Sequence, residues 1–576
     1  MGFRTQLKAI GFLYSIFRGD TKYYCSKSEK PLLKTVDMSG VFQEALPEQE
    51  GVRSEGLLKM FSELSDDRRV NPHSALVLRN GKLIAKTDWE PFSSEYLHVS
   101  HSLAKSVTAL AAGIAVKEKY IGIDEKLVDI FEGADKPLGV ATIRNLLTMS
   151  TGAKFNEAGS LLSENWIESF LSSETLFAPG TDFRYNSMNT YMLSAAICRR
   201  TGVSLSEYLS RRLFRPMNIE NFYWEKCPAG IEKGGWGLYM SIYDYARLGQ
   251  LWLNGGMWNG VQLVPREWIS VASSKQIANK DFCRDGYGFH VWLGKHGVIF
   301  SGMFGQIVYV VPKFDMVIAV TAGSENLFPC GGAFNYIDDF LGNSRNFSSN
   351  PISRFRYAET AALRKALASA KFGMPLENGS RKNIFSRLKA LFINQNRNSP
   401  ESVLNGVGIS FGSNRADIVP LLIQIMDGCF GHGIDEMKFL FSGDSFYLSA
   451  TIGGTVVKIP ISFSSASEFS YGNYRIASTA VFTADEDGYP VIKVQLCYLE
   501  TSCTKVLKFI FTERGVTLKI RESPKLYNAM DEISALTVTD ISEGVRKKLE
   551  SILESDAAGY RVKSIIEPTL EGKYVL

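Results

Sequence analysis

The sequence predicts an α+β protein, in which an antiparallel sheet flanked by helices is followed by a second domain of antiparallel strands. Strand-like apolar runs stand before and after a block of helical segments and do not alternate with them. Beyond residue 437, apolar and polar residues alternate, as they do in strands with one buried face. Of the 576 residues, 45% are hydrophobic and 22% charged, so packed cores are expected.

The first predicted sheet begins with a hairpin over residues 73–89. Two β-rich runs surround Asn80 and Gly81, and Asn-Gly is the pair that a tight hairpin turn favours. Further strands of this sheet are expected after the helical block, at residues 287–294, 305–312 and 315–323.

The helical block lies between these strands. One helix is predicted to start near Ser102, and the others to end at glycines, which accept the left-handed backbone found after a helix. These other helical segments are residues 143–152, 189–202 and 241–256.

Composition divides the chain into an N-terminal extension (1–50), a first domain (51–342), a linker with helical pieces (343–402) and a β-rich domain (403–576). Residues 343–400 hold eleven Lys and Arg but only two Glu, which predicts a solvated basic connector. The last domain is expected to end with a helix at 542–553. It contains no catalytic cluster, so we assign it an accessory role and leave open that it forms a homo-oligomer.

The charge and cysteine content exclude several classes of protein. A net charge of +4 gives no support for a nucleic-acid partner. Eight scattered cysteines do not form a disulfide framework or metal-ligand pairs, so we expect reduced thiols. Arg18 and Asp20 follow the short N-terminal apolar run, which predicts neither a removable signal nor a membrane span. We therefore expect a cytoplasmic protein.

Ser102 and Lys105 form the pattern S-x-x-K at the start of an apolar helix. Residues three apart share a helix face, so the amine could accept the proton of the hydroxyl. This requires a neutral lysine, which burial favours by lowering its pKa. The alternative is a capping serine followed by a solvated lysine in the first turn.

The segments around this pair resemble the serine β-lactamase-like hydrolases, which include class C β-lactamases, penicillin-binding proteins and related esterases and amidases. The resemblance covers about residues 51–342 and is strongest to the 6-aminohexanoate-dimer hydrolase branch. It rests on successive segments in family order, among them VSHSLAKSVTALAAGIAV, TIRNLLTMSTGAKF, PGTDFRYNSMNTYML and SGMFGQIVYVVPKFDMVIAVTAG. It implies a β-lactamase/transpeptidase-like fold and an acyl-enzyme on Ser102.

The same resemblance implies roles for further residues. Tyr185 takes the position of the proton shuttle, and Ser187, two residues later, lines the substrate pocket. The backbone N–H groups of Ser102 and Gln306 would form the oxyanion hole.

The third family element, usually K-T-G or H-x-G, aligns with Met303, Phe304 and Gly305, which we assign to the substrate pocket. No cationic group is present there, so the usual partner of the β-lactam carboxylate is missing. Neutral amide or ester turnover is therefore favoured over penicillin recognition.

Other chemistry finds little support. His98 and His101 are three residues apart, but without further Cys or His ligands they predict packing and no metal site. The sequence lacks a G-x-S-x-G elbow and a P-loop, and no cofactor is expected. We thus predict a serine hydrolase acting on a small-molecule amide or ester. Two alternatives stay open, namely a non-catalytic binding or regulatory protein with this fold, and a β-lactamase or D,D-peptidase.

Overall fold

The fold is taken from a computed structural model. It describes residues 30–131, 136–161, 163–279, 286–327, 331–353, 357–372, 381–392, 399–429, 431–442, 445–525 and 567–575. These residues fall into two compact units, 30–372 and 381–575. The predicted helix at 542–553 and most of the N-terminal extension lie outside the described residues.

The first unit contains a six-stranded sheet of order β2-β1-β11-β10-β9-β8, in which all neighbouring strands are antiparallel. Its strands are β1 (Pro72–Arg79), β2 (Lys82–Asp88), β8 (Trp292–Leu293), β9 (Val298–Gly302), β10 (Gln306–Val311) and β11 (Met316–Ala322). A small sheet of order β3-β5-β4 and the hairpin β6-β7 accompany it; their strands are β3 (His98–Val99), β4 (Tyr223–Trp224), β5 (Leu238–Met240), β6 (Met257–Trp258) and β7 (Val261–Gln262).

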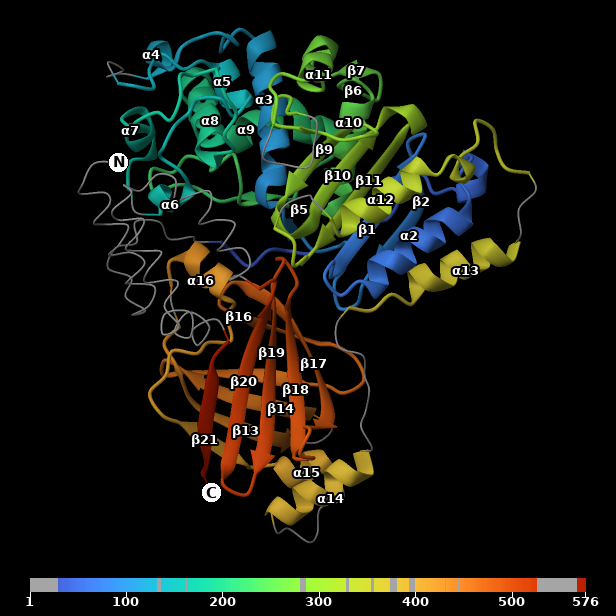
Figure 1. The fold of residues 1–576 in the computed structure, drawn as a ribbon, viewed down its shortest axis with the longest axis vertical. Helices are drawn as coiled ribbons and strands as arrows, with labels where there is room; N and C mark the ends of the chain where they lie inside the picture. Colours follow the sequence, from blue (N-terminus) through green and yellow to red (C-terminus); the bar gives the residue numbers. More distant parts are fainter. Residues whose placement is uncertain are drawn as a thin grey trace. The chain divides into compact units, whose positions relative to one another are not determined.

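Both faces of the main sheet are apolar and covered by helices (Figure 1). Successive side chains of a strand point to opposite faces. Along β11, Ile318 therefore joins one hydrophobic cluster, while Val317 and Ala319 join the other. The first cluster packs against α2 (Ser54–Asp66) and α12 (Ala333–Gly342), and α10 (Ile242–Leu253) contacts β10 and β11 in the second.

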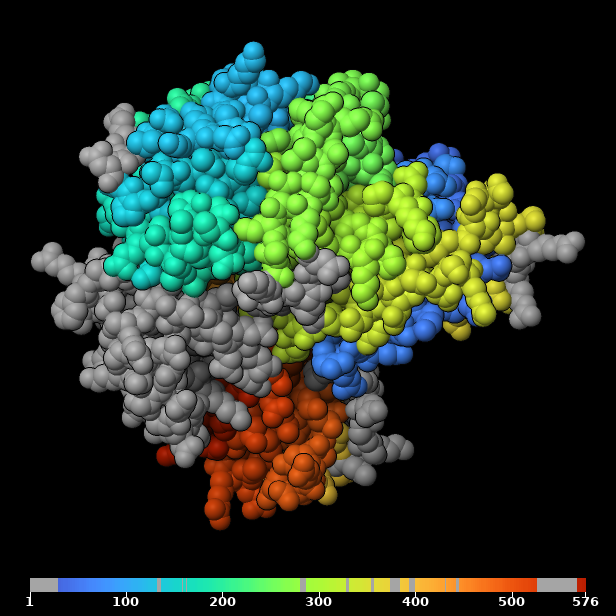
Figure 2. All heavy atoms as spheres, turned by 45° about the horizontal axis from the view of Figure 1, so that its top comes forward, coloured from blue at the N-terminus to red at the C-terminus, as the bar shows by residue number. Residues whose placement is uncertain are grey.

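The helical block stands between β2 and β8 in the chain, as the sequence predicts. In the space-filling view, the light-blue and teal part of this block lies beside the green α11 segment on the surface of the first unit (Figure 2). The remaining helices of the unit are α3 (Ala104–Lys117), α4 (Leu127–Ile130), α5 (Ile143–Leu147), α6 (Glu157–Ser160), α7 (Trp166–Leu171), α8 (Ser187–Thr201), α9 (Leu205–Leu209), α11 (Arg266–Ala272) and α13 (Tyr357–Ala368).

Two local predictions have different outcomes. The hairpin turn at Asn80 and Gly81 is confirmed, since both residues have positive φ angles of 51° and 73°. The strand expected over 287–294 is shorter, because only Trp292–Leu293 pairs as β8. His290 has a φ of 55°, and Gly288 N donates to Val291 O in a tight turn, so the preceding residues leave the extended conformation.

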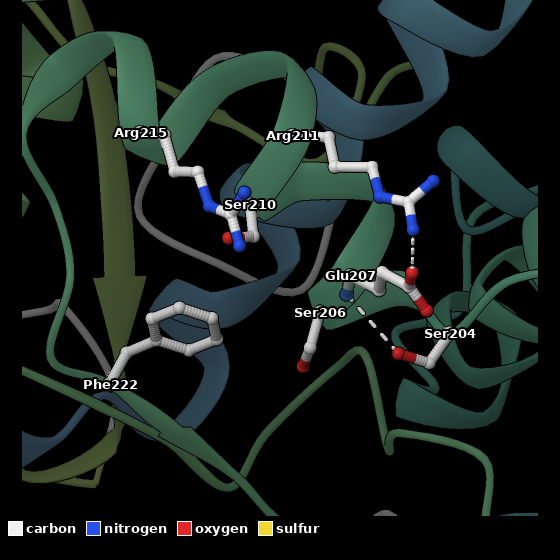
Figure 3. A pocket seen from close by; sticks show the side chains of 7 residues that line it. All are labelled: Ser204, Ser206, Glu207, Ser210, Arg211, Arg215 and Phe222. Atoms are coloured by element: carbon white, nitrogen blue, oxygen red, sulfur yellow. Dashed lines mark hydrogen bonds and ion pairs between the residues drawn. The ribbon is translucent and has the colours of Figure 1, made fainter.

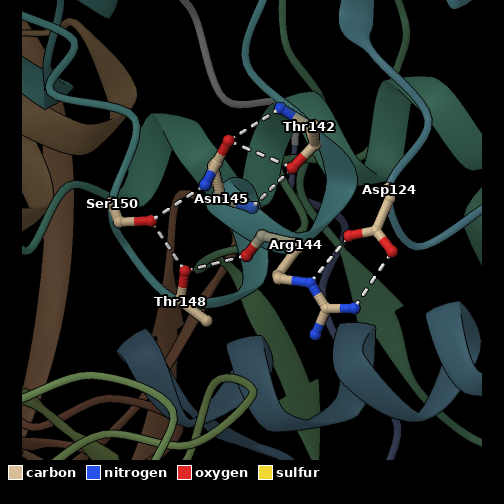
Figure 4. Close-up of polar contacts among 6 residues, drawn as sticks. All are labelled: Asp124, Thr142, Arg144, Asn145, Thr148 and Ser150. Carbon is tan, nitrogen blue, oxygen red and sulfur yellow. Dashed lines mark hydrogen bonds and ion pairs between the residues drawn. The ribbon is translucent and has the colours of Figure 1, made fainter. Parts of the chain in front are cut away.

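A network of polar side chains shapes the chain after α5 (Figure 4). Thr142 caps the helix by accepting from the backbone N–H of Asn145, and the Asn145 side chain donates to Ser150 Oγ. Ser150 also bonds Thr148 Oγ1 at 2.8 Å. The network fixes the segment that follows α5. In this segment, the carbonyl of Met149 accepts from the backbone N–H of Arg184, the residue before Tyr185.

The second unit is a ten-stranded antiparallel sheet of order β15-β14-β13-β12-β21-β20-β19-β18-β17-β16. The predicted second β domain is thus confirmed. The sheet is nearly closed, because β15 also contacts β16 and β17, and Ala480 N donates to Ser462 O at 2.8 Å. The strands are β12 (Gly408–Phe411), β13 (Ile434–Ser442), β14 (Ser445–Ile452), β15 (Thr455–Ile461), β16 (Ser467–Tyr471), β17 (Tyr474–Ala484), β18 (Pro490–Tyr498), β19 (Thr504–Thr512), β20 (Gly515–Ser523) and β21 (Thr569–Val575).

The interior of this sheet is filled by apolar side chains, including the ring pair Phe439 and Phe509. Among its described residues, the helices of this unit are α14 (Arg381–Phe392), α15 (Pro400–Leu404) and α16 (Leu421–Asp427). Within the described ranges of both units, no helix combines the length and the apolar character that a membrane crossing needs.

Candidate active site

Ser102 lies in a short 3-10 turn, η2 (His101–Leu103), that leads directly into α3. The strand β3 precedes this turn, and Ser100 N donates to Leu238 O at 2.8 Å, which attaches the turn to the small sheet. Helix α3 is buried from Ala104 to Ala115, so it is a core helix without a solvated face along this stretch. The first residues of the apolar run therefore take Lys105 into the interior.

Lys105 is 1% exposed and reaches Ser102. Its Nζ lies 2.8 Å from Ser102 Oγ and donates to the carbonyl of Gly235 at 2.9 Å. The alternative of a solvated lysine in the first turn is inconsistent with this burial. A neutral amine can donate to Gly235 and accept the proton of Ser102 through its lone pair.

Burial lowers the pKa of Lys105 from its ordinary value to about 7, because the charged form loses its hydration. The carboxylate of Glu157 opposes this effect by favouring the ammonium form. A substantial fraction of the amine is therefore neutral near pH 7, as a general base requires.

Tyr185 faces the same pair from the segment that precedes α8. Asn186 is the N-cap of α8 and accepts from Met188 N, which fixes the backbone beside Tyr185. The Tyr185 ring stacks on Trp292 with centroids 5.5 Å apart, and Lys105 Nζ lies 4.9 Å from its centroid. Burial raises the pKa of Tyr185, and a hydrogen bond with the Ser102 side chain lowers it. The structure thus brings the three predicted catalytic side chains together.

The third family element forms the turn between β9 and β10. Phe304 and Gly305 have φ angles of 61° and 87°, which make the turn tight. The turn lies near Ser102, since η2 contacts both strands and a Cβ on Gly302 would approach Ser100 O to 2.1 Å. β10 begins at Gln306, whose role in the oxyanion hole stays a prediction.

The side chain of Gln306 has a structural function that the sequence did not reveal. Its Nε2 donates to Ala322 O at 2.7 Å, and its Oε1 accepts from Ala322 N at 3.3 Å. Nε2 also lies 3.2 Å from the carbonyls of Met303 and Phe304. The residue therefore ties the turn to β11.

The other predicted pocket residues differ in their surroundings. Phe304 is 2% exposed and packs edge to face on His101, with centroids 5.5 Å apart. Met303 is partly exposed, while Ser187 is buried and its N–H donates to Glu157 Oε1 at 2.7 Å. Their assignment to the substrate pocket stays a prediction.

His98 and His101 are buried in the first unit. His98 Nδ1 lies 3.0 Å from Val99 O, and its Nε2 lies 3.0 Å from His73 Nδ1. Burial lowers the pKa of His101 to about 3. In the described parts of the chain, no three His, Cys, Asp or Glu side chains converge in a group that could hold a metal ion.

A pocket of about 400 Å³ lies elsewhere in the first unit, at α9 (Figure 3). Arg211 forms an ion pair with Glu207, whose N–H donates to Ser204 Oγ at 3.1 Å. The lining residues are Ser204, Ser206, Glu207, Ser210, Arg211, Arg215 and Phe222. None of the predicted catalytic residues is among them.

Two residues of the site were missed by the sequence analysis. Gly235 supplies a main-chain carbonyl, for which side-chain type gives no signal. Glu157 is exposed, and its charge acts on both Lys105 and Tyr185. It begins the short helix α6, far from Lys105 in the sequence, so only the fold relates it to Lys105.

Known proteins are similar to this chain over its first half. The family model described as Beta-lactamase matches residues 57–329. The 6-aminohexanoate-dimer hydrolase of Paenarthrobacter ureafaciens is 24% identical over 277 residues, which cover 42% of this chain and 70% of that protein. An uncharacterized protein of Alkalihalophilus pseudofirmus is 24% identical over 326 residues, covering 49% of this chain and 91% of the other.

Among solved structures, the octameric penicillin-binding protein homologue from Pyrococcus abyssi is similar to this chain. It has 18% identity and a TM-score of 0.39, and the match covers 81% of this chain and 99% of that chain. The stretch matched by the family model contains Ser102, Lys105, Tyr185 and Gln306.

Proposed function

Because residues 57–329 form a domain of the serine β-lactamase-like hydrolase superfamily, we propose that the protein cleaves an amide or ester bond through an acyl-enzyme on Ser102. Lys105 is the general base of this reaction, and Tyr185 is the proton shuttle. One observation carries the proposal: a buried amine with a pKa of about 7 lies 2.8 Å from the serine hydroxyl.

The reaction has two halves. Ser102 Oγ attacks the substrate carbonyl while its proton passes to the neutral Lys105, and the oxyanion is stabilised by the N–H groups of Ser102 and Gln306. The proton then moves through Tyr185 to the leaving amine or alkoxide as the bond to it breaks. In the second half, water attacks the acyl-enzyme and gives a proton to Lys105. Lys105 passes this proton to Ser102 Oγ as the acyl–oxygen bond breaks, which releases the acid and restores free Ser102 and the neutral amine.

The substrate class follows from the turn at Met303–Gly305. β-Lactamases need a partner for the substrate carboxylate, and this turn carries no cationic side chain. We therefore propose a neutral small-molecule amide or ester as substrate. The missing cation also motivates the alternative of a non-catalytic binding protein with this fold.

The setting of the enzyme is proposed on the sequence alone. We propose a cytoplasmic hydrolase without a nucleic-acid partner or a cofactor. The four-part domain division, with its accessory β domain, is retained as part of this proposal, and assembly into a homo-oligomer through the second unit stays open.

The test compares the full-length protein with Ser102→Ala, using a fluorophosphonate probe and p-nitrophenyl esters. Labelling and turnover that disappear in Ser102→Ala support the proposal, while Ser172→Ala, which alters an exposed serine at the end of α7, serves as the matched control. Absence of labelling and turnover in the unmodified protein favours the binding protein. Rapid nitrocefin hydrolysis favours the β-lactamase alternative.

A further inference from the structure

The carbonyl that accepts from Lys105 belongs to a glycine turn in the connection between β4 and β5. Gly234 O accepts from Thr108 Oγ1 at 2.8 Å, and Gly235 O accepts from Lys105 Nζ at 2.9 Å. Lys105 and Thr108 are three residues apart on α3, so one face of the helix binds two successive carbonyls. The position of this turn therefore affects where the Lys105 amine sits.

The turn has little room to move toward α8. Gly234 has a φ of 65°, and a Cβ there would approach Thr190 O to 2.9 Å. A Cβ on Gly235 would approach Ser187 O to 3.0 Å. The two glycines thus pack directly on the backbone of the helix that follows Tyr185.

On its other side, the turn is held by a buried ion pair. Lys233 Nζ lies 2.6 Å from Glu225 Oε2, and the two side chains are 4% and 3% exposed. Lys233 N donates to Glu225 O at 2.9 Å, and Gly235 N donates to Lys233 O at 2.6 Å. Glu225 N donates to Gly237 O at 2.9 Å, so main-chain and side-chain bonds fasten both ends of the turn.

Stability alone is a weak explanation for such a pair. Taking two charges out of water costs about as much free energy as their attraction returns, and apolar replacements of both partners are often neutral. Removing one partner is costly, because the other charge stays buried alone. A buried pair is therefore better suited to fixing one geometry than to adding net stability.

We propose that Glu225 and Lys233 are positioning residues, whose ion pair holds the turn at 233–237 and thereby aims the Gly235 carbonyl at the amine of Lys105. The inference rests on the proposed function, since it assigns the pair to the orientation of the proposed base. Neither residue is expected to touch the substrate.

The test replaces both partners by apolar residues in the full-length protein, as Glu225→Leu with Lys233→Met. The kcat for a p-nitrophenyl ester is expected to fall about tenfold to a hundredfold through misplacement of the base, with KM within about twofold. A carbonyl accepts more strongly from an ammonium than from an amine. Loss of the Gly235 carbonyl as acceptor destabilises the charged form of Lys105. The acid limb of the pH profile of kcat/KM, where activity falls as Lys105 becomes protonated, should therefore move to lower pH.

The matched control is the same kind of replacement at another buried ion pair of the first unit, Asp244→Leu with Arg247→Met, whose side chains are 1% and 10% exposed. This control should leave the acid limb in place. Restoring the pair in reverse, as Glu225→Lys with Lys233→Glu, should recover part of kcat. If the apolar variant does not fold, kcat and the pH profile of this reversed variant provide the test instead.

The outcomes separate the two proposals. If the unmodified protein shows no Ser102-dependent turnover, the proposed function fails. If it is active and the folded apolar variant keeps both kcat and the acid limb, the positioning role is overturned. An acid limb that moves to higher pH also overturns it, because that shift reports water entering around Lys105.

Discussion

Lys105 shows at the scale of one residue how the fold changes the chemistry of a side chain. In an unfolded chain its amine is charged at neutral pH. In the folded protein it is 1% exposed, and burial lowers its pKa to about 7. The same side chain thus changes from a solvated cation to a buried amine beside a hydroxyl, with a substantial fraction neutral near pH 7.

Glu157 raises the pKa of Lys105 and so opposes the effect of burial. Its carboxylate favours the ammonium form of Lys105, so Glu157→Gln should lower the pKa of Lys105 and shift the acid limb of kcat/KM to lower pH. The amide keeps an oxygen that can accept from Ser187 N. The pH profile of p-nitrophenyl ester hydrolysis measures the shift, with Glu174→Gln, an exposed partner of Lys154, as control.

A profile of Glu157→Gln that is unchanged, while Glu174→Gln is also unchanged, would show that Glu157 does not act on the titrating group. A shift to higher pH would contradict the expected direction, since removal of a nearby negative charge cannot favour an ammonium.

At the scale of one element, the turn between β9 and β10 is held by the side chain of Gln306. Gln306 bonds both the N–H and the carbonyl of Ala322 and lies near two turn carbonyls. Gln306→Met keeps the size but removes these bonds, and each buried polar group that is left unpaired costs about 1–3 kcal/mol. The turn would lose its side-chain attachment to β11, while the main-chain pairing of β10 with β11 persists.

We therefore expect Gln306→Met to lower the free energy of unfolding by about 2 kcal/mol or more, measured by urea denaturation. Fluorophosphonate labelling of Ser102 should slow in the same variant, because the backbone of the turn is displaced. Unchanged stability together with an unchanged labelling rate would refute this role of the Gln306 side chain.

The whole molecule contains two units with separate hydrophobic cores. Ile318 is 1% exposed in the first unit, and Leu507 is fully buried in the second. Truncation of a buried Ile or Leu to Ala costs about 2–5 kcal/mol. Each truncation should therefore lower the melting temperature of its own unit.

Calorimetry should show two transitions. Ile318→Ala is expected to shift one of them and Leu507→Ala the other, with Ser102 labelling reduced only by melting of the first unit. A single transition that both variants shift equally would instead indicate that the two units unfold as one cooperative body.

Buried neutral histidines make the first unit sensitive to acid. Burial lowers the pKa of His73, His101 and His290 in the folded state. Below the ordinary histidine pKa of 6.5 the unfolded chain binds more protons, so the free energy of unfolding falls with falling pH. For His101 this loss continues down to about pH 3. Well above pH 6.5 the histidines are neutral in both the folded and the unfolded state, so no stability is lost there.

Each such histidine contributes up to about 1.4 kcal/mol per pH unit. His290 is a suitable probe, because neither ring nitrogen has a hydrogen-bond partner among the described residues. Urea denaturation between pH 7.5 and 5 should show a shallower decline for His290→Phe than for the unmodified protein. Equal slopes would mean that His290 is not buried neutral.

Much of the fold could be predicted from local pattern. The Asn80-Gly81 hairpin, the helical block and the alternating second domain follow from short-range periodicity and turn chemistry, and all three are found. The strand at 287–294 was predicted too long, because the left-handed φ of His290 breaks a run that is otherwise strand-like. The spacing of apolar residues does not indicate where the backbone takes a left-handed conformation.

The pairing of Ser102 with Lys105 follows from local sequence, since residues three apart lie on the same side of a helix and of the 3-10 turn that leads into it. The rest of the site depends on how distant segments pack. The Gly235 carbonyl comes from 130 residues away, and Tyr185 and Glu157 arrive on other segments. Burial, which lowers the lysine pKa, is a property of packed elements, and no local stretch of sequence contains it.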